Sequence, residues 1–94
     1  MKAFSKEGEY LYDIGNEGSG DGQLNEPLGL AIDKFNNLIV CDAANSNLQA
    51  FTLEGKFVST IRTSLFGRPW SIAVDTCGLL LIFDAGKKCI LVLE

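Results

Sequence analysis

The chain has 94 residues, which is enough for one small domain and too few for two. Hydrophobic residues make up 47% and charged residues 21%, a balance that excludes an intrinsically disordered chain. The formal net charge of -4 disfavours a general affinity for nucleic acid or anionic membranes, and the absence of histidine removes the commonest metal ligand and general base.

No apolar run in the sequence reaches the length of a transmembrane helix, and residues 1–7 lack the apolar core of a signal peptide, so we expect neither. The three cysteines, Cys41, Cys77 and Cys89, form no C-x-x-C pair and no zinc-binding spacing. Cys41 and Cys89 lie inside apolar runs and are predicted to be buried free thiols. Free thiols indicate a reducing compartment, so we expect a cytoplasmic protein.

Short strands separated by turn residues follow one another along the chain. They recur about every ten residues, with Gly and Asn between them, and no segment has the apolar period of a helix. The predicted strands cover residues 9–15, 28–33, 38–42, 48–52, 57–61 and three stretches within 70–94. The pattern therefore predicts an all-β chain.

The strongest signal is an internal repeat. Residues 27–33 (PLGLAID) recur 42 positions later as residues 69–75 (PWSIAVD). Residues 3–10 (AFSKEGEY) are echoed 47 positions later by residues 50–57 (AFTLEGKF). We therefore expect one domain over residues 1–94 that contains a complete unit of four strands at 28–61, three strands of a second unit at 70–94, and an outer strand at 9–15.

The middle strand of each unit, at 38–41 and 79–83, is apolar at every position. Side chains alternate between the two faces of a strand, so a sheet with such strands has to be covered on both sides. With no helices to do this, small antiparallel sheets must stack on one another around an axis. That arrangement is a β-propeller, whose blades have four strands and repeat about every 40–45 residues.

The first repeat carries a distinctive pattern in residues 20–33 (GDGQLNEPLGLAID), 37–42 (NLIVCD), 45–51 (NSNLQAF) and 55–57 (GKF). This pattern resembles the NHL repeat, most closely that of the tripartite-motif proteins. The second repeat departs from the pattern, since Ser71 replaces a glycine and Lys87 an asparagine, and Asn47 stands where the family usually has arginine.

The resemblance implies a propeller of six blades, whereas this chain supplies two. An exposed face of ~400 Å² would forgo roughly 10 kcal/mol at about 25 cal/mol per Å², which is comparable with the whole stability of a domain, roughly 5–15 kcal/mol. We therefore expect a homotrimer with C3 symmetry that completes the six blades. Strand exchange would place residues 9–15 of one chain beside residues 89–93 of a neighbour. The alternative is that the chain is an excised or engineered piece of a longer propeller.

We interpret the protein as a non-catalytic interaction scaffold that binds protein partners through the loops 15–27, 43–47, 62–69 and 85–88. The candidate partner-binding residues are four basic side chains on one loop face, Arg62, Arg68, Lys87 and Lys88. The alternative is RNA binding, because some NHL propellers of tripartite-motif proteins bind RNA through a basic face. The same loops carry three acidic residues, which leaves an excess of one positive charge per chain, and Trp70 is expected between the blades.

Other chemistry is disfavoured. The glycine-rich residues 15–22 lack the lysine of a phosphate loop and are predicted to connect blades with positive φ angles. A ring of carboxylates could bind a cation on the axis, but hydrogen bonds to turn amides are the favoured role of the four recurring aspartates, Asp33, Asp42, Asp75 and Asp84. Similar six-bladed propellers include metal-dependent lyases and lactonases. Without histidine we expect no catalytic residue, metal site or cofactor here.

Overall fold

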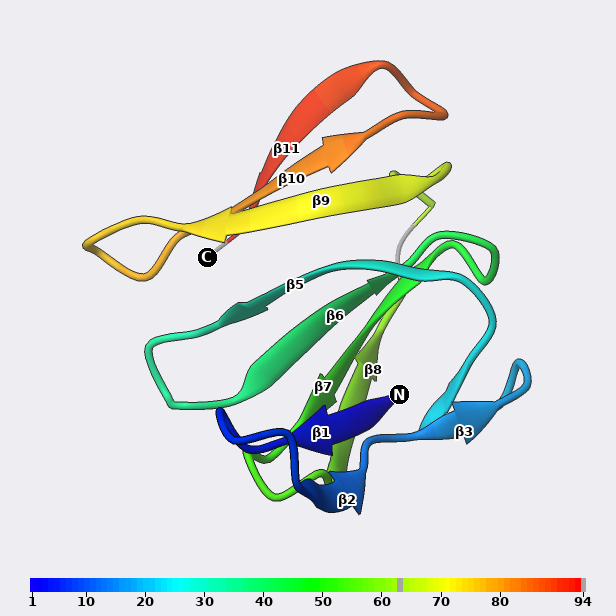
Figure 1. Ribbon diagram of the computed structural model, residues 1–94. Coiled ribbons are helices and arrows are strands. Elements are labelled where there is room, and N and C mark those ends of the chain that lie inside the picture. Colours follow the sequence, from blue (N-terminus) through cyan, green and yellow to red (C-terminus); the bar gives the residue numbers. More distant parts are fainter. Residues whose placement is uncertain (63, 94) are drawn as a thin grey trace.

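The computed structural model describes residues 1–62 and 64–93, and the regular structure within these ranges is all β (Figure 1). The strands are β1 (Lys2–Phe4), β2 (Tyr10–Asp13), β3 (Asn16–Glu17), β4 (Gln23–Leu24), β5 (Pro27–Ile32), β6 (Leu38–Asp42), β7 (Asn47–Phe51), β8 (Phe57–Ile61), β9 (Pro69–Val74), β10 (Leu80–Asp84) and β11 (Cys89–Leu93). The all-β fold class predicted from the sequence is confirmed.

Blade 1 is a four-stranded antiparallel sheet with the strand order β5-β6-β7-β8. Its two middle strands, β6 and β7, are buried at every position, as the uninterrupted apolar run in β6 predicts. The turns between strands use left-handed backbone at Asn36 (φ 63°) and Gly55 (φ 91°), residue types that tolerate it. Blade 1 is therefore a complete propeller blade.

Blade 2 has three strands in the order β11-β10-β9. Its register pairs Leu80 with Leu93 and Ile82 with Leu91, so these four apolar side chains share one face of the sheet. Within the described ranges β11 is an edge strand. Glu94, the last residue of the predicted second unit, and Thr63 in the loop 62–69 lie outside those ranges.

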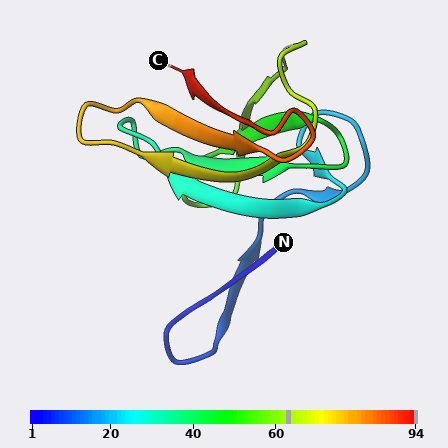
Figure 2. The ribbon, with the colours of Figure 1, turned by 90° about the horizontal axis from the view of Figure 1, so that it is seen from above.

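The N-terminal strands β1 and β2 form a separate hairpin, which projects beside the stacked blades in Figure 2. β2 lies within the predicted strand 9–15, whereas β1, β3 and β4 were not predicted. The turn of this hairpin has the same two backbone hydrogen bonds as the turn between β7 and β8. The amides of Ser5 and Gly8 donate to Glu9 and Ser5, at 2.8 and 2.9 Å, and those of Thr52 and Gly55 donate to Lys56 and Thr52 at the same two distances.

The two blades stack face to face through their first strands, β5 and β9 (Figure 2). At the closest point Gly29 lies against the backbone of Ser71, and a Cβ atom on Gly29 would come within 2.8 Å of the Ser71 Cα. Such a distance is not tolerated between real atoms, so this approach requires glycine. Gly29 thereby fixes how closely the blades pack.

The inter-blade core lies between blade 1 and blade 2. Its buried members are Ile39, Cys41, Leu48 and Ala50 from blade 1, and Phe66, Leu80 and Ile82 from the blade 2 side. Ile72 and Val74 of β9 pack against it. Burial raises the pKa of the Cys41 thiol to about 12, so this thiol is a small apolar core group. All three cysteines are free, but the prediction that Cys89 is buried is wrong, because its side chain on the edge strand β11 is only partly covered.

The N-terminal core lies on the opposite face of blade 1, under the β1–β2 hairpin. It consists of the buried residues Ile14, Leu24, Leu38, Val40 and Phe51, against which Met1, Ala3 and Tyr12 pack. The Tyr12 hydroxyl donates a hydrogen bond to the Leu53 carbonyl, which ties the hairpin to blade 1. The two cores account for the apolar coverage of both faces of blade 1 around β6 and β7.

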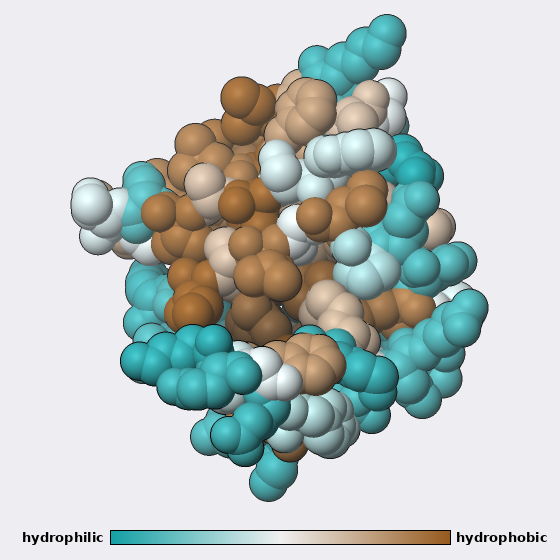
Figure 3. Space-filling view, in the orientation of Figure 1, coloured by the Kyte–Doolittle hydropathy of each residue, from teal (hydrophilic) through white to brown (hydrophobic). Residues whose placement is uncertain are grey.

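Two apolar sheet faces nevertheless remain open to solvent. On β5, Leu30 is 57% exposed, and on β11, Ile90 is 65% exposed. Figure 3 shows apolar residues gathered across the face of the molecule that carries β5 and β9 in Figure 1.

Among residues 1–62 and 64–93 we find no helix with the length and apolarity that crossing a membrane requires.

Candidate functional site

The predicted partner-binding loops gather at one end of the two blades, which we call the loop face. Hydrogen bonds join them to one another. The Asn45 side-chain amide donates to the Gly18 carbonyl at 2.9 Å, and the Ser46 hydroxyl donates to the Gly67 carbonyl at 2.6 Å. The loop face is therefore one connected surface that spans both blades.

Asp42 holds the first half of this surface in place from the end of β6. Its side chain is fully buried and accepts hydrogen bonds from the backbone amides of Asn25 (3.1 Å) and Glu26 (2.8 Å) and from the Asn45 side chain (2.6 Å). A buried carboxylate with three donors is satisfied without a cation. Asp42 therefore fixes the loop that enters β5 to the loop that leaves β6.

Asp84 does the same in blade 2, from the end of β10. It is fully buried and accepts from the amides of Gly67 (2.7 Å), Arg68 (2.8 Å) and Lys87 (2.9 Å). Burial by itself would raise the pKa of Asp84, but these backbone donors favour the ionised form more strongly and hold the pKa below its ordinary value. The loops of blade 2 are therefore pinned to an ionised carboxylate.

The other two recurring aspartates lie at the opposite end of the blades. Asp33 accepts from the amides of Phe35 and Asn37, both at 2.9 Å, and Asp75 accepts from those of Cys77 and Leu79, both at 2.8 Å. All four aspartates thus accept hydrogen bonds from turns or loops, as the favoured interpretation predicts. Among the described residues no group of three or more His, Cys, Asp or Glu side chains is arranged to hold a metal ion.

The glycine-rich segment 15–22 is a connector into blade 1, as predicted. Gly15 and Gly22 have φ angles of 63° and 74°, and a Cβ atom on Gly15 would come within 2.9 Å of the Gly22 carbonyl oxygen. The segment folds back on itself through the short parallel pair of β3 and β4. Its amides serve this local fold, as when Gly20 donates to the Gln23 side chain at 2.9 Å.

The structure places all four predicted basic residues at the loop face, but it pairs two of them. Arg62 forms an ion pair with Asp21 at 3.4 Å, and Arg68 forms one with Glu26. Lys87 and Lys88 are exposed, and their ammonium groups form no ion pair with the described residues. The positive charge of this face is therefore partly neutralised within the chain.

Trp70 is the functional candidate whose position the sequence did not predict. It is 44% exposed instead of lying wedged between the blades, and the Arg68 guanidinium lies over its ring at 5.7 Å from the centroid. The repeat aligns Trp70 with Leu28, an apolar residue near the start of a strand, and this equivalence does not indicate exposure. The loop face thus carries a stacked arginine–tryptophan pair beside two free lysines.

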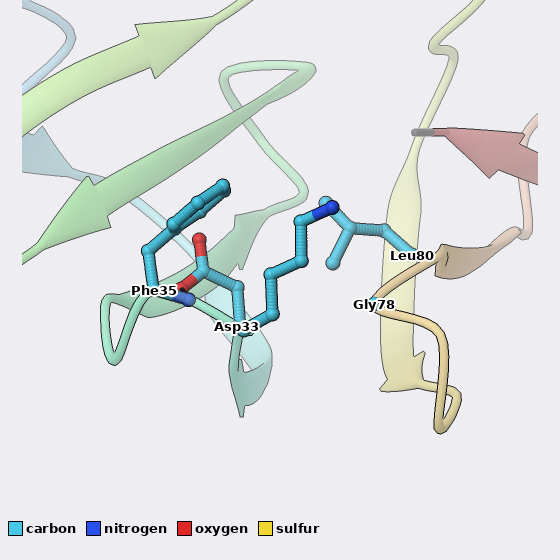
Figure 4. A pocket seen from close by; sticks show the side chains of 5 residues that line it. Asp33, Phe35, Gly78 and Leu80 are labelled. Carbon is cyan, nitrogen blue, oxygen red and sulfur yellow. Dashed lines mark hydrogen bonds between the residues drawn. The ribbon is translucent and has the colours of Figure 1, made fainter.

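The opposite end offers a small hollow between two turns (Figure 4). Asp33, Lys34, Phe35, Gly78 and Leu80 line it, and its volume is about 60 Å³. Small-molecule sites usually measure ~300–1,000 Å³. A hollow of this size does not identify a ligand site.

Comparison with curated proteins finds three groups of relatives. The chain is 44% identical over 46 residues to Protein lin-41 of Caenorhabditis elegans, 41% identical over 44 residues to the E3 ubiquitin-protein ligase TRIM71 of Mus musculus, and 40% identical over 48 residues to Protein brain tumor of Drosophila melanogaster. These matches cover 47–51% of this chain and only 4–5% of the relatives.

A family model described as a 6-bladed beta-propeller matches residues 3–88, which is nearly the whole chain. Together with the relatives, this match confirms the predicted resemblance to the NHL-repeat propellers of tripartite-motif proteins. The repeat of 42 residues and the stacked antiparallel blades are features of that architecture. The chain belongs to the 6-bladed beta-propeller family.

Proposed function

We propose that the protein is a non-catalytic interaction scaffold, in which three copies close a six-bladed ring that binds protein partners through its loop face. The observation that carries this proposal is the contact between blade 1 and blade 2. The chain presents both halves of that contact a second time, on its two outer faces, and among the described residues each of these faces keeps exposed apolar side chains.

The first half is on β5. In blade 2, Ile72 and Val74 of β9 pack onto the inter-blade core. Their repeat equivalents in blade 1 are Leu30 and Ile32, which are 57% and 51% exposed. These two residues pair in register with Val40 and Leu38, so they extend the face of blade 1 that points away from blade 2.

The second half is on blade 2. Blade 1 contributes Ile39, Cys41, Leu48 and Ala50 to the inter-blade core. Their equivalents in blade 2 are Leu81, Phe83, Ile90 and Val92, of which the last three are exposed. β5 of a second copy would cover this face as β9 covers blade 1, and the same contact repeated head to tail closes by rotation into a ring.

Charge complementarity supports the ring. Glu26 and Arg68 hold equivalent positions in the two repeats and pair across the blade boundary. In a ring of three copies, Arg68 of one copy would meet Glu26 of the next at the boundary between copies. Negative and positive side chains would then alternate around all six blades.

The loop face is suited to a protein partner. Asp42 and Asp84 fix its loops, so little conformational freedom remains to be lost on binding. Tryptophan and arginine dominate the energetics of protein interfaces, and here Trp70 and Arg68 form an exposed stacked pair. Lys87 and Lys88 add free positive charge, which favours a partner that presents carboxylates.

RNA binding is less well supported, because Arg62 and Arg68 already pair with carboxylates of the same chain. Phosphate binding draws on unpaired cations. One relative is named as an E3 ubiquitin-protein ligase, but the match covers only 5% of that protein. We therefore do not propose ligase activity for this chain.

Native mass spectrometry of the 94-residue chain tests the ring, with a three-copy particle as the expected result. Leu30→Glu is expected to abolish this particle and leave a folded monomer, because Leu30 is exposed in the single chain. Phe35→Glu, on the exposed turn after β5, is the matched control, because it makes the same change from an apolar residue to glutamate outside the proposed contact. A particle that survives Leu30→Glu would contradict the proposed contact.

Selection of phage-displayed peptides on the immobilised protein tests the loop face. We expect acidic peptides whose binding is lost in the Lys87→Glu and Lys88→Glu double variant and kept in Lys34→Glu. Labelled oligouridylate is expected not to bind at ~0.15 M salt. Oligouridylate binding that the double variant removes would favour RNA as the partner.

A further inference from the structure

The N-terminal core and the inter-blade core are two copies of one arrangement. Members of the first are equivalent to members of the second at offsets of 42 and 47 positions. The equivalent pairs are Leu24 and Phe66, Leu38 and Leu80, Val40 and Ile82, Ile14 and Ile61, Met1 and Leu48, and Ala3 and Ala50. The β1–β2 hairpin therefore lies where the third and fourth strands of a blade before blade 1 would lie.

Two buried members of the inter-blade core have no counterpart in the N-terminal core. These are Ile39 and Cys41, which come from the second strand of blade 1. Their repeat equivalents are Leu81 and Phe83 on β10, and Phe83 is 43% exposed. Within the described chain, the place before blade 1 therefore holds counterparts of only the third and fourth strands of a blade, and blade 2 of a second copy offers the first two.

If blade 2 of a second copy packed on this face of blade 1, it would also bring its third strand, β11, to the position that β1 already occupies. Ile90 and Val92 of β11 are equivalent to Met1 and Ala3 of β1, because both pairs correspond to Leu48 and Ala50. Two strands cannot fill one position in a sheet. Assembly on this face therefore requires one of them to leave.

Few interactions hold β1 in this position. It is three residues long, whereas β11 has five. Its polar anchors are two reciprocal hydrogen bonds between Met1 and Ile14 and one exposed ion pair. The N-terminal ammonium donates to the Ile14 carbonyl at 2.9 Å, and the Ile14 amide donates to the Met1 carbonyl at 2.7 Å. Lys2 pairs with Asp13 at 3.1 Å and lies over the Tyr10 ring, but both partners of this ion pair are more than half exposed, so it contributes little to stability.

We propose that β11 of a second copy replaces β1 beside β2, so that residues 1–5 form a self-cap that opposes assembly of the ring. This inference rests on the proposed function. By the register of β7 with β8, Val92 would then lie opposite Tyr12 of the second copy, and Leu91 opposite its Asp13. The exposed Ile90 and Val92 would take the places of Met1 and Ala3 in the N-terminal core.

Sedimentation velocity over a range of concentrations tests the self-cap. Removing residues 1–5, or changing Ala3→Glu, is expected to lower the concentration of half-assembly roughly tenfold, an ordinary size for a coupling effect. Lys6→Glu, on the turn of the same hairpin, is the matched control and is expected to leave it unchanged. Val92→Glu is expected to prevent assembly, because it puts a charge on the incoming strand.

The outcomes separate the two proposals. If the full chain forms trimers and the truncation weakens them or leaves them unchanged, the self-cap is wrong and the ring stands. If neither the full chain nor the truncation assembles at any concentration, the ring itself is wrong.

Hydrogen exchange on the full-length chain gives an answer even if the truncation does not fold. On assembly, amides of residues 1–5 are expected to lose protection while those of residues 89–93 gain it. Retained protection of residues 1–5 in the assembled particle would overturn the exchange of β1 for β11.

Discussion

Glu26 and Arg68 hold the same position in the two repeats, 42 residues apart, and form an ion pair across the boundary between the blades. Each side chain is about two-fifths exposed, so the pair contributes little to the stability of one chain, ~0–1 kcal/mol. Its significance lies in the alternation of charge that it would impose on a ring.

This alternation predicts the outcome of a charge swap. Glu26→Arg would place six positive side chains around the ring, and Arg68→Glu six negative ones, so each single change is expected to weaken assembly. The double variant restores alternation and is expected to assemble like the wild type. Sedimentation velocity at low and high salt measures this, because salt screens the repulsion in the single variants. A double variant no better than the single ones would exclude the pairing.

The change Ser71→Gly is expected to have opposite effects on two quantities, the stability of the single chain and the strength of assembly. Gly29 permits the close approach of β5 and β9, and Ser71 is its equivalent on the open face of blade 2. Ser71→Gly is expected to cost the single chain about 0.5–1 kcal/mol and yet to tighten assembly, because it removes a Cβ atom from the boundary between copies. Ala73→Gly on the same strand is the control: its equivalent Ala31 keeps its Cβ atom on β5, so this change is expected to destabilise the single chain without tightening assembly.

The lowered pKa of Asp84 predicts that the folded protein loses stability at low pH. Its pKa is held below the ordinary value of about 3.9, so its contribution is present above that pH and is lost as the pH falls through the lowered value. Asp84→Ala would leave three backbone amides without their acceptor and is expected to cost about 3 kcal/mol at neutral pH. Denaturant unfolding at several pH values measures both effects. Asp84→Ala should abolish this part of the acid sensitivity.

The difference in burial between Cys77 and Cys41 predicts that the two thiols react with a labelling reagent at different rates. Cys77 is exposed, whereas Cys41 lies in the inter-blade core with its pKa raised to about 12. Iodoacetamide is therefore expected to modify Cys77 at the rate of an accessible thiol and Cys41 only when the blades separate. Mass spectrometry of the digested protein follows both sites. Equal rates at Cys41 and Cys77 would show that the inter-blade core is not closed.

The strands of both blades could be predicted from the sequence because the internal repeat aligns the strand sequences of blade 1 with those of blade 2, so each pattern is seen twice. The middle strands of 38–42 and 80–84 were recognisable from continuous apolar residues, and the aspartates that follow them from their recurrence. β1 could not be predicted, because Lys2–Phe4 has three residues and no periodicity of its own. Its echo of Ala50 and Phe51 was visible, but only the packing of Met1 and Ala3 assigns it a place.

The candidate site was predictable in composition and less so in geometry. That Arg62 and Arg68 lie at one end follows from the alternation of turns in an antiparallel sheet. Their pairing with Asp21 and Glu26 depends on how the glycine-rich connector folds, and the exposure of Trp70 depends on how the blades stack. Both are set by contacts between residues about 40 positions apart, which a local pattern does not encode.

Sedimentation equilibrium of the 94-residue chain tests the central claim most directly, since the claim is that two open apolar faces of one copy are covered by two others. The predicted result is a particle of three times the chain mass of 10.2 kDa, in equilibrium with monomer. A single species of 10.2 kDa at every concentration, with Leu30 and Ile90 exposed to solvent, would contradict the account.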